Sequence, residues 1–421
     1  MENTQKYEFK SHDFAGLQHS LLGIKDQQSQ MLETLIEWSR INSGSSNLSG
    51  LKVMEERITD AFASLGASVD FIQLEPTERL NHDGTVEAVE NGRSILISKR
   101  PTANRRVLLT GHFDTVFPED SDFQDVTWLG DNILNGPGVA DMKGGILVML
   151  HALMAFEASD QAENLGWEVL LSPEEETGSL ASGPVLAERA KHAQIGLTYE
   201  PALADGTLAG ARAGSGNWSL VVKGKAAHAG REFDLGRNAV VKLSQIIGEL
   251  SDLTGGRPKL TVNPAVISGG VAPNIVPDQA FCRFNARVHE PDDAIWLQEK
   301  LAAIIAKHHG KDGFEVIMHG GINRPPKPIT EAIGRLMEAV RACGAFNDIK
   351  VDYVATGGCC EGNNLAAAGL PNVDTLGVRG GKIHSADEFV CVDSLSERAA
   401  LSATILYAFA KGYLDNVIDE T

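Results

Sequence analysis

The sequence predicts an α/β protein with a mostly parallel sheet, into which a second, α+β unit is inserted. Short apolar strands alternate with helical segments on both sides of residues 213–326. Within that range the expected order is β-α-β-β-α-β, and a stiff Asn-Arg-Pro-Pro joint at residues 323–326 ends it. We therefore predict a larger domain made of residues 1–212 and 327–421, with residues 213–326 as the inserted domain.

The first half of the larger domain begins with helices. Residues 1–22 are polar and are expected to form a loose or helical arm, and helical patterns follow near residues 25–41 and 50–66. Residues 145–156 are apolar nearly all round, which indicates a buried helix. Apolar runs with turn residues around them predict strands at Ser94–Lys99, Arg106–Thr110, Trp167–Leu171 and Ile195–Tyr199.

Glycines at 210, 214 and 216 mark the change to the inserted unit. Its predicted strands are Trp218–Lys223, Leu260–Ile267, Ala280–His289 and Phe314–His319, and its predicted helices are Asn238–Leu250 and Asp292–Lys307. After the joint, α/β alternation returns. Helices are expected near 329–343, 362–369 and 393–415, with strands at Val351–Ala355 and Val373–Leu376.

Composition excludes several classes of partner. The chain has 37 Lys+Arg against 56 Asp+Glu, a net charge of −19, which argues against nucleic acid and anionic membranes. No stretch approaches the roughly 18 apolar residues of a membrane span, and the polar N-terminus does not look like a signal peptide. Five cysteines without a Cys-x-x-Cys motif indicate reduced thiols. We expect a cytoplasmic protein with no nucleic-acid or membrane partner.

Residues that can bind metal follow the predicted strands. His112 and Asp114 come directly after one strand, and Asp114 could fix the tautomer of His112 while the other ring nitrogen binds a cation. A solvated turn with a capping Asp explains the same run equally well. Asp141 lies in a glycine-rich loop that opens the buried helix. The Gly-x-x-x-x-Gly-Lys-Ser/Thr spacing of a phosphate loop is absent there, and a carboxylate bridging two cations fits better.

Further carboxylates end the next two strands. The run Glu174–Glu176 follows one strand, and Glu200 ends another before Pro201. Taken alone, each of these carboxylates would be interpreted as an ordinary solvated surface residue. Their convergence with a late histidine favours a site, because strand ends of an open α/β sheet meet at one edge. Imidazole and carboxylate ligands without cysteine suit a hydrolytic zinc site. The residues expected to meet are His112, Asp141, Glu175, Glu176, Glu200 and His384.

These motifs resemble those of the co-catalytic zinc exopeptidases, a family that includes bacterial glutamate carboxypeptidase (carboxypeptidase G type), aminoacylase, and acetylornithine and succinyl-diaminopimelate deacylases. The resemblance covers the chain from about residue 25. It is carried by Gly-His-Phe-Asp-Thr-Val at 111–116, Gly-Val-Ala-Asp-Met-Lys-Gly at 138–144, Glu-Glu-Thr-Gly-Ser at 175–179, Glu-Pro at 200–201, and His384.

The resemblance implies roles for these residues. One zinc ion would be held by His112, Glu200 and the bridging Asp141, and a second by Asp141, Glu176 and His384. Cobalt or manganese would fit the same ligands. Glu175 would be the general base and Asp114 the partner of His112. The family often has a cis peptide after its bridging Asp, so the bond from Asp141 to Met142 is expected to be cis.

The inserted unit would be the family's ferredoxin-like lid, which makes the dimer in many relatives. His228, in Gly-Lys-Ala-Ala-His-Ala-Gly, would reach a catalytic site, often that of the partner subunit, and steady the tetrahedral intermediate. Asn274 and Arg287 match lid residues that bind a substrate carboxylate, and Arg287 would supply positive charge that the acidic chain otherwise lacks. Arg324 is a weaker candidate, since hinge arginines are commonly structural. The lid would close on hinges near 210–216 and 322–328.

One segment departs from the family pattern. Gly357 and Gly358 match glycines near the substrate-binding wall, but relatives commonly continue with a small or hydroxyl residue and then Asp, where this chain has Cys359-Cys360-Glu361. This difference bears on which substrate is bound rather than on metal binding. A cysteine nucleophile is not indicated, because no nearby base is evident.

The function implied is zinc-dependent hydrolysis of an amide bond beside a substrate carboxylate, of the glutamate-carboxypeptidase type, on a small peptide or N-acyl amino acid. An N-acyl amino acid deacylase is the alternative within the same chemistry. A catalytically silent dimer that binds amino-acid-like ligands is the alternative from another class. The intact ligand set and Glu175 argue against it.

Overall fold

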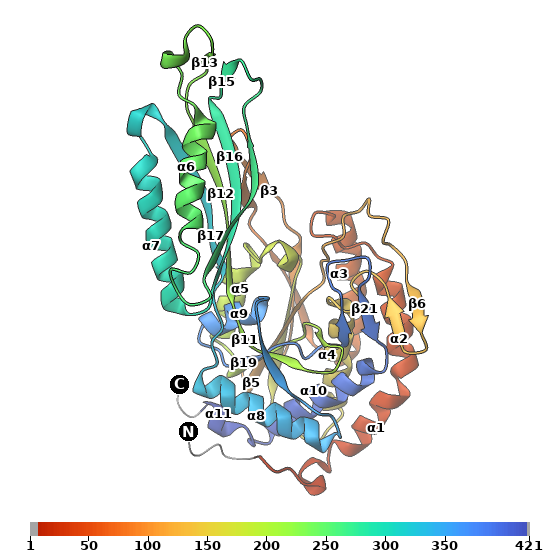
Figure 1. Ribbon diagram of the computed structural model, residues 1–421. Coiled ribbons are helices and arrows are strands. Elements are labelled where there is room, and N and C mark those ends of the chain that lie inside the picture. The colour runs from red at the N-terminus through yellow and green to blue at the C-terminus, as the bar shows by residue number, and fades with distance from the viewer. Residues whose placement is uncertain (1–6, 419–421) are drawn as a thin grey trace.

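The computed structural model describes residues 7–418, so the arm predicted for residues 1–22 lies partly outside the described residues. Figure 1 shows a rounded body from which a narrower unit projects. We call the projecting unit, from β12 to β17, the lid, and the remainder the body. No helix among the described residues is both long enough and apolar enough to cross a membrane.

The body is built on a six-stranded, mostly parallel sheet, which confirms the predicted fold class. Its strands, in spatial order, are β1 (Ser68–Gln73), β4 (Arg93–Lys99), β8 (Gly166–Ser172), β5 (Arg106–His112), β9 (Ile195–Thr198) and β19 (Asn372–Val373). Strands β8, β5, β9 and β19 run parallel, whereas β4 is antiparallel to β8 and β1 is antiparallel to β4. From Val107 onward β5 is buried, as a strand covered on both faces should be.

Helices cover this sheet. Helix α4 (Lys143–Glu157) is almost wholly buried and packs against the equally buried α10 (Ser394–Ala410). The other helices of the body are α1 (Gln18–Asp26), α2 (Gln28–Ser39), α3 (Leu48–Phe62), α5 (Ser182–Ala190), α8 (Glu331–Phe346), α9 (Glu361–Ala367) and α11 (Asp415–Ile418).

The helix expected near 25–41 corresponds to α2, whereas α1 ends at Asp26, before the break at Gln27, and lies mostly in the arm predicted for residues 1–22. The helix expected near 393–415 ends at Ala410, and α11 follows after Gly412, whose φ of +81° stops the helix. Short 3-10 helices occur at Ser11–Phe14, Ala63–Leu65, Ala162–Asn164, Glu175–Thr177, Phe233–Leu235 and Lys311–Gly313.

Several short strands were not predicted, because two to five residues carry too little alternation to be recognised. A five-stranded sheet has the order β10 (Ala202–Leu203), β20 (Arg379–Gly381), β21 (Phe389–Cys391), β7 (Ile133–Asn135) and β6 (Thr127–Gly130). Strand β11 (Leu208–Arg212) was also not predicted, and it pairs with β18 (Tyr353–Thr356), which corresponds to the strand predicted at Val351–Ala355. A hairpin is formed by β2 (Thr77–Leu80) and β3 (Val86–Val89).

The lid has the β-α-β-β-α-β order expected from its sequence. Its elements are β12 (Gly214–Lys223), α6 (Ala239–Ser251), β14 (Thr261–Gly269), β16 (Gln279–Val288), α7 (Pro291–His308) and β17 (Glu315–Arg324). The antiparallel sheet has the order β14-β16-β12-β17, and a separate apolar core joins it to both helices. Two further strands, β13 (Ala227–His228) and β15 (Ile275–Val276), pair at the end of the lid farthest from the body (Figure 1).

The two chain crossings between body and lid are bound to each other. The backbones of Arg212 and Lys327 exchange two hydrogen bonds of 3.0 Å. Both side chains also donate to the buried carboxylate of Asp374, just after β19, with donor–acceptor distances of 2.7–2.8 Å. Asn363 adds hydrogen bonds to backbone carbonyls of both crossings. The base of the lid is therefore fixed to the main sheet, and the exact domain boundaries stay a prediction.

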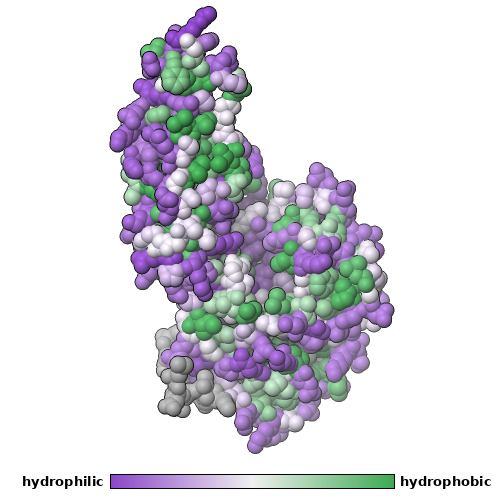
Figure 2. Space-filling model, viewed as in Figure 1, coloured by the Kyte–Doolittle hydropathy of each residue, from purple (hydrophilic) through white to green (hydrophobic). Residues whose placement is uncertain are grey.

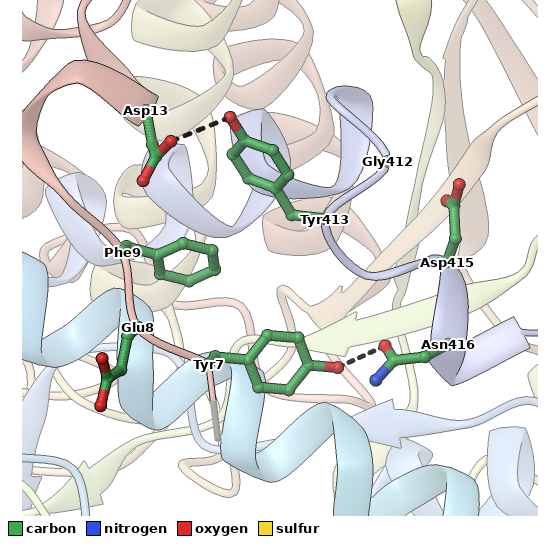
Figure 3. A pocket seen from close by; sticks show the side chains of 8 residues that line it. All are labelled: Tyr7, Glu8, Phe9, Asp13, Gly412, Tyr413, Asp415 and Asn416. Atoms are coloured by element: carbon green, nitrogen blue, oxygen red, sulfur yellow. Dashed lines mark hydrogen bonds between the residues drawn. The ribbon is translucent and has the colours of Figure 1, made fainter. Parts of the chain in front are cut away.

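The N-terminal and C-terminal segments of the described chain lie side by side on the body. In Figure 3, Tyr7 and Phe9 face the turn after α10, where Tyr413 donates to Asp13 over 3.3 Å and Tyr7 donates to Asn416. The residues around this shallow pocket are remote in sequence from every motif at the strand ends.

Candidate metal centre

The five predicted ligands meet at the strand ends of the body. They form two groups, His112–Asp141–Glu200 and Asp141–Glu176–His384, and in each group the ligand atoms lie within 4.8 Å of one another. Asp141 belongs to both groups. The tertiary structure thus brings together residues that are up to 272 positions apart in the sequence (384 − 112).

Asp141 lies between the two histidines. Its Oδ1 is 3.2 Å from Nε2 of His112, and its Oδ2 is 3.3 Å from Nε2 of His384. The loop that carries it is held by Glu388, whose carboxylate accepts three backbone N–H groups over 2.9–3.1 Å. The peptide bond after Asp141 is cis, as the family resemblance implied.

A glycine allows this loop to approach Glu200. Gly145 opens α4 directly against the backbone of Tyr199, where a Cβ atom would lie 2.1 Å from the Tyr199 carbonyl oxygen. Only glycine permits that contact. Glu200 is buried, its Oε1 is 3.8 Å from Nε2 of His112, and this oxygen has no hydrogen-bond partner among the described residues. A buried carboxylate oxygen without a partner is costly unless a cation or water meets it.

Asp114 connects His112 to the loop after β8. Nδ1 of His112 is 3.1 Å from the backbone oxygen of Asp114 and 3.3 Å from its Oδ1. The Asp114 carboxylate also accepts the backbone N–H groups of Glu175 and Glu176, over 3.1 and 3.2 Å, and the hydroxyl of Ser45 over 2.6 Å. Since Nδ1 faces these oxygens, Nε2 is the nitrogen that points into the site.

The second group is more open. His384 lies in a turn, with φ of +61°, and its side chain is 54% exposed. Its Nε2 is 3.0 Å from Oε2 of Glu176. This group therefore has one face toward solvent, from which a substrate can approach.

The electrostatics of the cluster favour bound cations. Burial and the negative charge of Asp141 raise the pKa of Glu176 to about 8 and that of Glu200 to about 7. Hydrogen bonds to Asp141 and then to Glu176 raise the pKa of His384 to about 11. Carboxylates so crowded need positive charge between them, and oxygen and imidazole donors fit Zn²⁺, Co²⁺ or Mn²⁺. The residues present therefore fit a dinuclear site.

Glu175, beside the predicted ligand Glu176, is hydrogen-bonded to an arginine of the lid. Its Oε1 accepts a hydrogen bond of 2.5 Å from Nη2 of Arg324, the last residue of β17, and its backbone oxygen accepts a second of 3.2 Å. The other arm of the guanidinium donates to Asn364 over 2.7 Å. Arg324 is 2% exposed, so the arginine at the base of the lid is occupied by the body.

Arg287 extends from the lid to the wall formed by Gly357 and Gly358. Its guanidinium donates to the carbonyl oxygen of Gly357 over 3.3 Å and contacts the thiol of Cys359 over 3.5 Å. The structure thus brings one of the predicted substrate residues against the predicted wall.

His228 and Asn274 lie elsewhere. His228 is the last residue of β13, and Asn274 directly precedes β15. The N–H of Ala229 donates to the Asn274 carbonyl oxygen over 3.0 Å, and both His228 and Asn274 are exposed. The β13–β15 pair is at the end of the lid farthest from the body (Figure 1). Within one chain the structure does not bring either residue to the metal ligands.

Three polar residues near the candidate site were given no role from the sequence. Glu388 lies four residues after His384 but looks like a surface acid until its three backbone partners are seen. Asn364 lies on α9 and reaches Arg324 only in the folded chain. Glu361 belongs to the segment Cys359-Cys360-Glu361, which differs from the family pattern, but its complete burial was not predicted. No local pattern distinguishes such residues from surface polar groups.

Comparison with known proteins agrees with this geometry. The model of "Peptidase family M20/M25/M40" matches residues 108–408. Carboxypeptidase G2 from Pseudomonas sp. (strain RS-16) is 26% identical over 400 residues, which cover 92% of this chain and 91% of that one. Succinyl-diaminopimelate desuccinylase from Bordetella petrii is 28% identical over 344 residues, which cover 77% of this chain and 88% of that one.

A solved structure shows the same fold. The YXEP protein of Bacillus subtilis, described as a dinuclear metal binding peptidase from the M20 family, superposes with a TM-score of 0.60 at 12% identity, covering 92% of this chain and 99% of that one. The family match spans well over half of the chain, and it includes all five residues of the two candidate metal-binding groups. The chain therefore belongs to peptidase family M20/M25/M40 and is a metallohydrolase of that family.

Proposed function

We propose that the protein is a dinuclear metal-dependent hydrolase that cleaves an amide bond beside a substrate carboxylate, of the glutamate-carboxypeptidase type. The observation that carries the proposal is the pair of ligand groups that share Asp141. The similarity to carboxypeptidase G2 over nearly the whole chain supports the type of substrate.

One metal ion would be held by His112, Asp141 and Glu200, and the other by Asp141, Glu176 and His384. Zinc is the proposed metal, with cobalt or manganese as substitutes for the same donors. When bound, the two ions supply Lewis acidity to the attacking water and to the scissile carbonyl. Asp114 keeps His112 oriented, and Glu388 keeps the Asp141 loop in place.

Glu175 is the proposed general base. It follows β8 directly beside Glu176, so its carboxylate is within one residue of a ligand and is itself not a member of either group. It takes a proton from the attacking water and delivers it to the leaving amine. The hydrogen bond to Arg324 holds one of its oxygens, which leaves the other for the water.

Arg287 is proposed to bind the substrate carboxylate. Asn274, which lies with His228 at the far end of the lid, would take part only at the centre of a partner chain. In a chain with net charge −19, a local guanidinium is needed to attract an anionic group. Gly357 and Gly358 form the wall beside Arg287, and a glycine wall admits a substrate close to the backbone. Arg324 stays a weaker candidate for the carboxylate, because a substrate would have to displace Glu175 from it.

We also propose a homodimer formed through the lid, in the cytoplasm. Strand β13, which ends at His228, lies at the end of the lid farthest from the body (Figure 1), so His228 would serve the metal centre of a partner rather than that of its own chain. The lid exposes apolar side chains that a partner would cover, and Figure 2 shows hydrophobic residues gathered along it. They include Val241, Val266, Ile267, Val271 and Ile275. At the metal centre of the partner chain, His228 would stabilise the oxyanion of the tetrahedral intermediate.

An N-acyl amino acid deacylase is the second candidate, supported by the similarity to succinyl-diaminopimelate desuccinylase. Both reactions cut an amide beside a carboxylate, so the same residues serve either. A silent ligand-binding homologue would be expected to have lost a ligand or Glu175, and neither is lost.

The proposal is tested on the purified protein by metal analysis and by hydrolysis of a substrate panel. The panel contains folyl- and peptidyl-glutamates, N-acetyl amino acids and N-succinyl amino acids. We expect two transition-metal ions per chain, glutamate release that chelation abolishes, and recovery on adding Zn²⁺. Release of acetate or succinate alone would identify a deacylase. No turnover after reconstitution with metal would overturn the proposal.

A further inference from the structure

A hairpin of the body lies against the lid. Strands β2 and β3 leave the body between β1 and β4, and they pass beside β16 of the lid (Figure 1). Leu80 at the end of β2 is buried against Val221, Phe281 and Ile317 of the lid sheet. The residues on either side of Val221 in β12 and of Phe281 in β16 belong instead to the apolar core beneath α6 and α7. Since side chains alternate along a strand, the hairpin covers the face opposite those helices.

The contact between hairpin and lid is specific. The ring of His82 stacks on Phe281, with 4.2 Å between centroids and 15° between planes. Nδ1 of His82 is 3.1 Å from the hydroxyl of Ser268, and the side chain of Gln279 donates to the His82 carbonyl oxygen over 2.5 Å. These interactions fix the hairpin across two lid strands, β14 and β16.

The base of the hairpin reaches the catalytic loop. The Asn91 side chain donates to the Glu75 carbonyl oxygen over 2.7 Å and closes the base. The next residue, Gly92, lies so close to Pro173 that a Cβ atom on it would be 2.8 Å from the Pro173 Cβ. Pro173 directly precedes the loop of residues 174–178, which holds Glu175. The base of the hairpin therefore lies directly against a residue with a stiff ring at the start of this loop.

We propose that the β2–β3 hairpin is a strap that couples the position of the lid to the loop carrying Glu175, with Gly92 against Pro173 as the point of transmission. The mechanical link is independent of the reaction, but its effect on catalysis rests on the proposed function of Glu175. When the part of the lid beyond the two chain crossings moves relative to the body, the strap is drawn with the lid sheet, and its base shifts against Pro173. Leu80 and Gly92 are thus positioning residues.

Loosening the strap at its lid end is the first test. Leu80 and Val86 are register partners in the hairpin, yet Leu80 is buried against the lid whereas Val86 is 54% exposed. Leu80→Ser should speed amide exchange, measured by hydrogen–deuterium exchange and mass spectrometry, both in residues 77–89 and in residues 174–178. The matched control Val86→Ser should change neither. Faster exchange in the hairpin with no change in residues 174–178 would overturn the proposal.

Changing the base of the strap is the second test, and it leaves the lid contact intact. Gly92→Ala places a methyl group against Pro173. We expect altered exchange in residues 174–178, unaltered exchange in residues 77–80, unchanged metal content, and a kcat about ten-fold lower with little change in KM, because misplaced reacting groups lose rate. Unchanged exchange together with unchanged kcat would overturn the proposal.

The two proposals fail in different ways. If the wild-type protein hydrolyses no amide of the panel, the proposed function fails, and the exchange measurements still decide whether the strap transmits displacement. If the wild-type protein hydrolyses substrate but neither variant changes amide exchange in residues 174–178, only the strap proposal fails.

Discussion

The guanidinium of Arg324 lies 2.5 Å from the carboxylate of Glu175 and donates to it. Arg324 is the last residue of the lid sheet, and Glu175 follows the central strand β8 of the body. The proposed general base is therefore held by a residue of the lid. The two side chains are 3% and 11% exposed, so little water competes for this charge-assisted hydrogen bond.

Replacing Glu175 by Gln should abolish turnover while metal binding is kept. The amide can still accept from Arg324, but it cannot take a proton from water. We expect kcat to fall by roughly 10³-fold or more, at the upper end of what general-base catalysis contributes. The measurements are kcat on the best substrate of the panel and metal content by mass spectrometry. Near-native activity in this variant would show that another group is the base.

The companion variant Arg324→Lys serves as a control for that experiment. Lysine keeps the charge but cannot bridge Glu175 and Asn364 as the forked guanidinium does. Its kcat should lie between those of the wild-type and Glu175→Gln proteins. If only KM rises, Arg324 binds the substrate rather than holding the base.

Replacing Asp141 by Asn should remove both metal ions, because Asp141 belongs to both ligand groups. Replacing Glu176 by Gln should weaken only the ion that Glu176 shares with His384. The number of ions per chain after dialysis, measured by plasma mass spectrometry, separates the two results. Retention of two ions by the Asp141→Asn protein would contradict the bridging role.

Replacing Glu361 by Gln should stabilise the protein increasingly as the pH rises. Glu361 is fully buried, neither carboxyl oxygen has a hydrogen-bond partner among the described residues, and burial raises its pKa well above the usual 4.5. Because the folded pKa is raised, the stability that this group contributes is present below pH 4.5 and is lost as the pH rises through the folded pKa.

The loss amounts to about 1.4 kcal/mol per pH unit over that interval, and Gln removes it. Urea unfolding at pH 5 and at pH 8 measures the effect, with Glu188→Gln on an exposed side of α5 as the control. An equal difference between wild type and variant at both pH values would show that Glu361 does not stay protonated in the folded protein.

A mixture of Glu175→Gln chains with His228→Ala chains should regain activity that neither protein has alone. A mixed dimer contains one centre with an intact Glu175 that receives His228 from its partner. The test is hydrolysis after co-refolding, with size-exclusion chromatography of the mixture. A protein that elutes as a monomer and fails to complement would exclude a His228 contribution from a partner.

The sequence by itself determined the fold class and indicated the ligand set. Apolar strands such as β5 and the all-round apolar α4 are recognisable because burial on both faces leaves no polar positions. The ligands follow such elements within a few residues, so their motifs are local. Family membership follows from the same motifs, whereas the roles of the single residues stay predictions.

Only the tertiary structure decided which distant groups act on those ligands. Glu388 holds the Asp141 loop, Arg324 holds Glu175, and Gly92 meets Pro173. It also placed His228, the last residue of β13, at the far end of the lid. These relationships join elements far apart in sequence through contacts between side chain and backbone. Since no periodic pattern records such contacts, they appear only when the chain is packed.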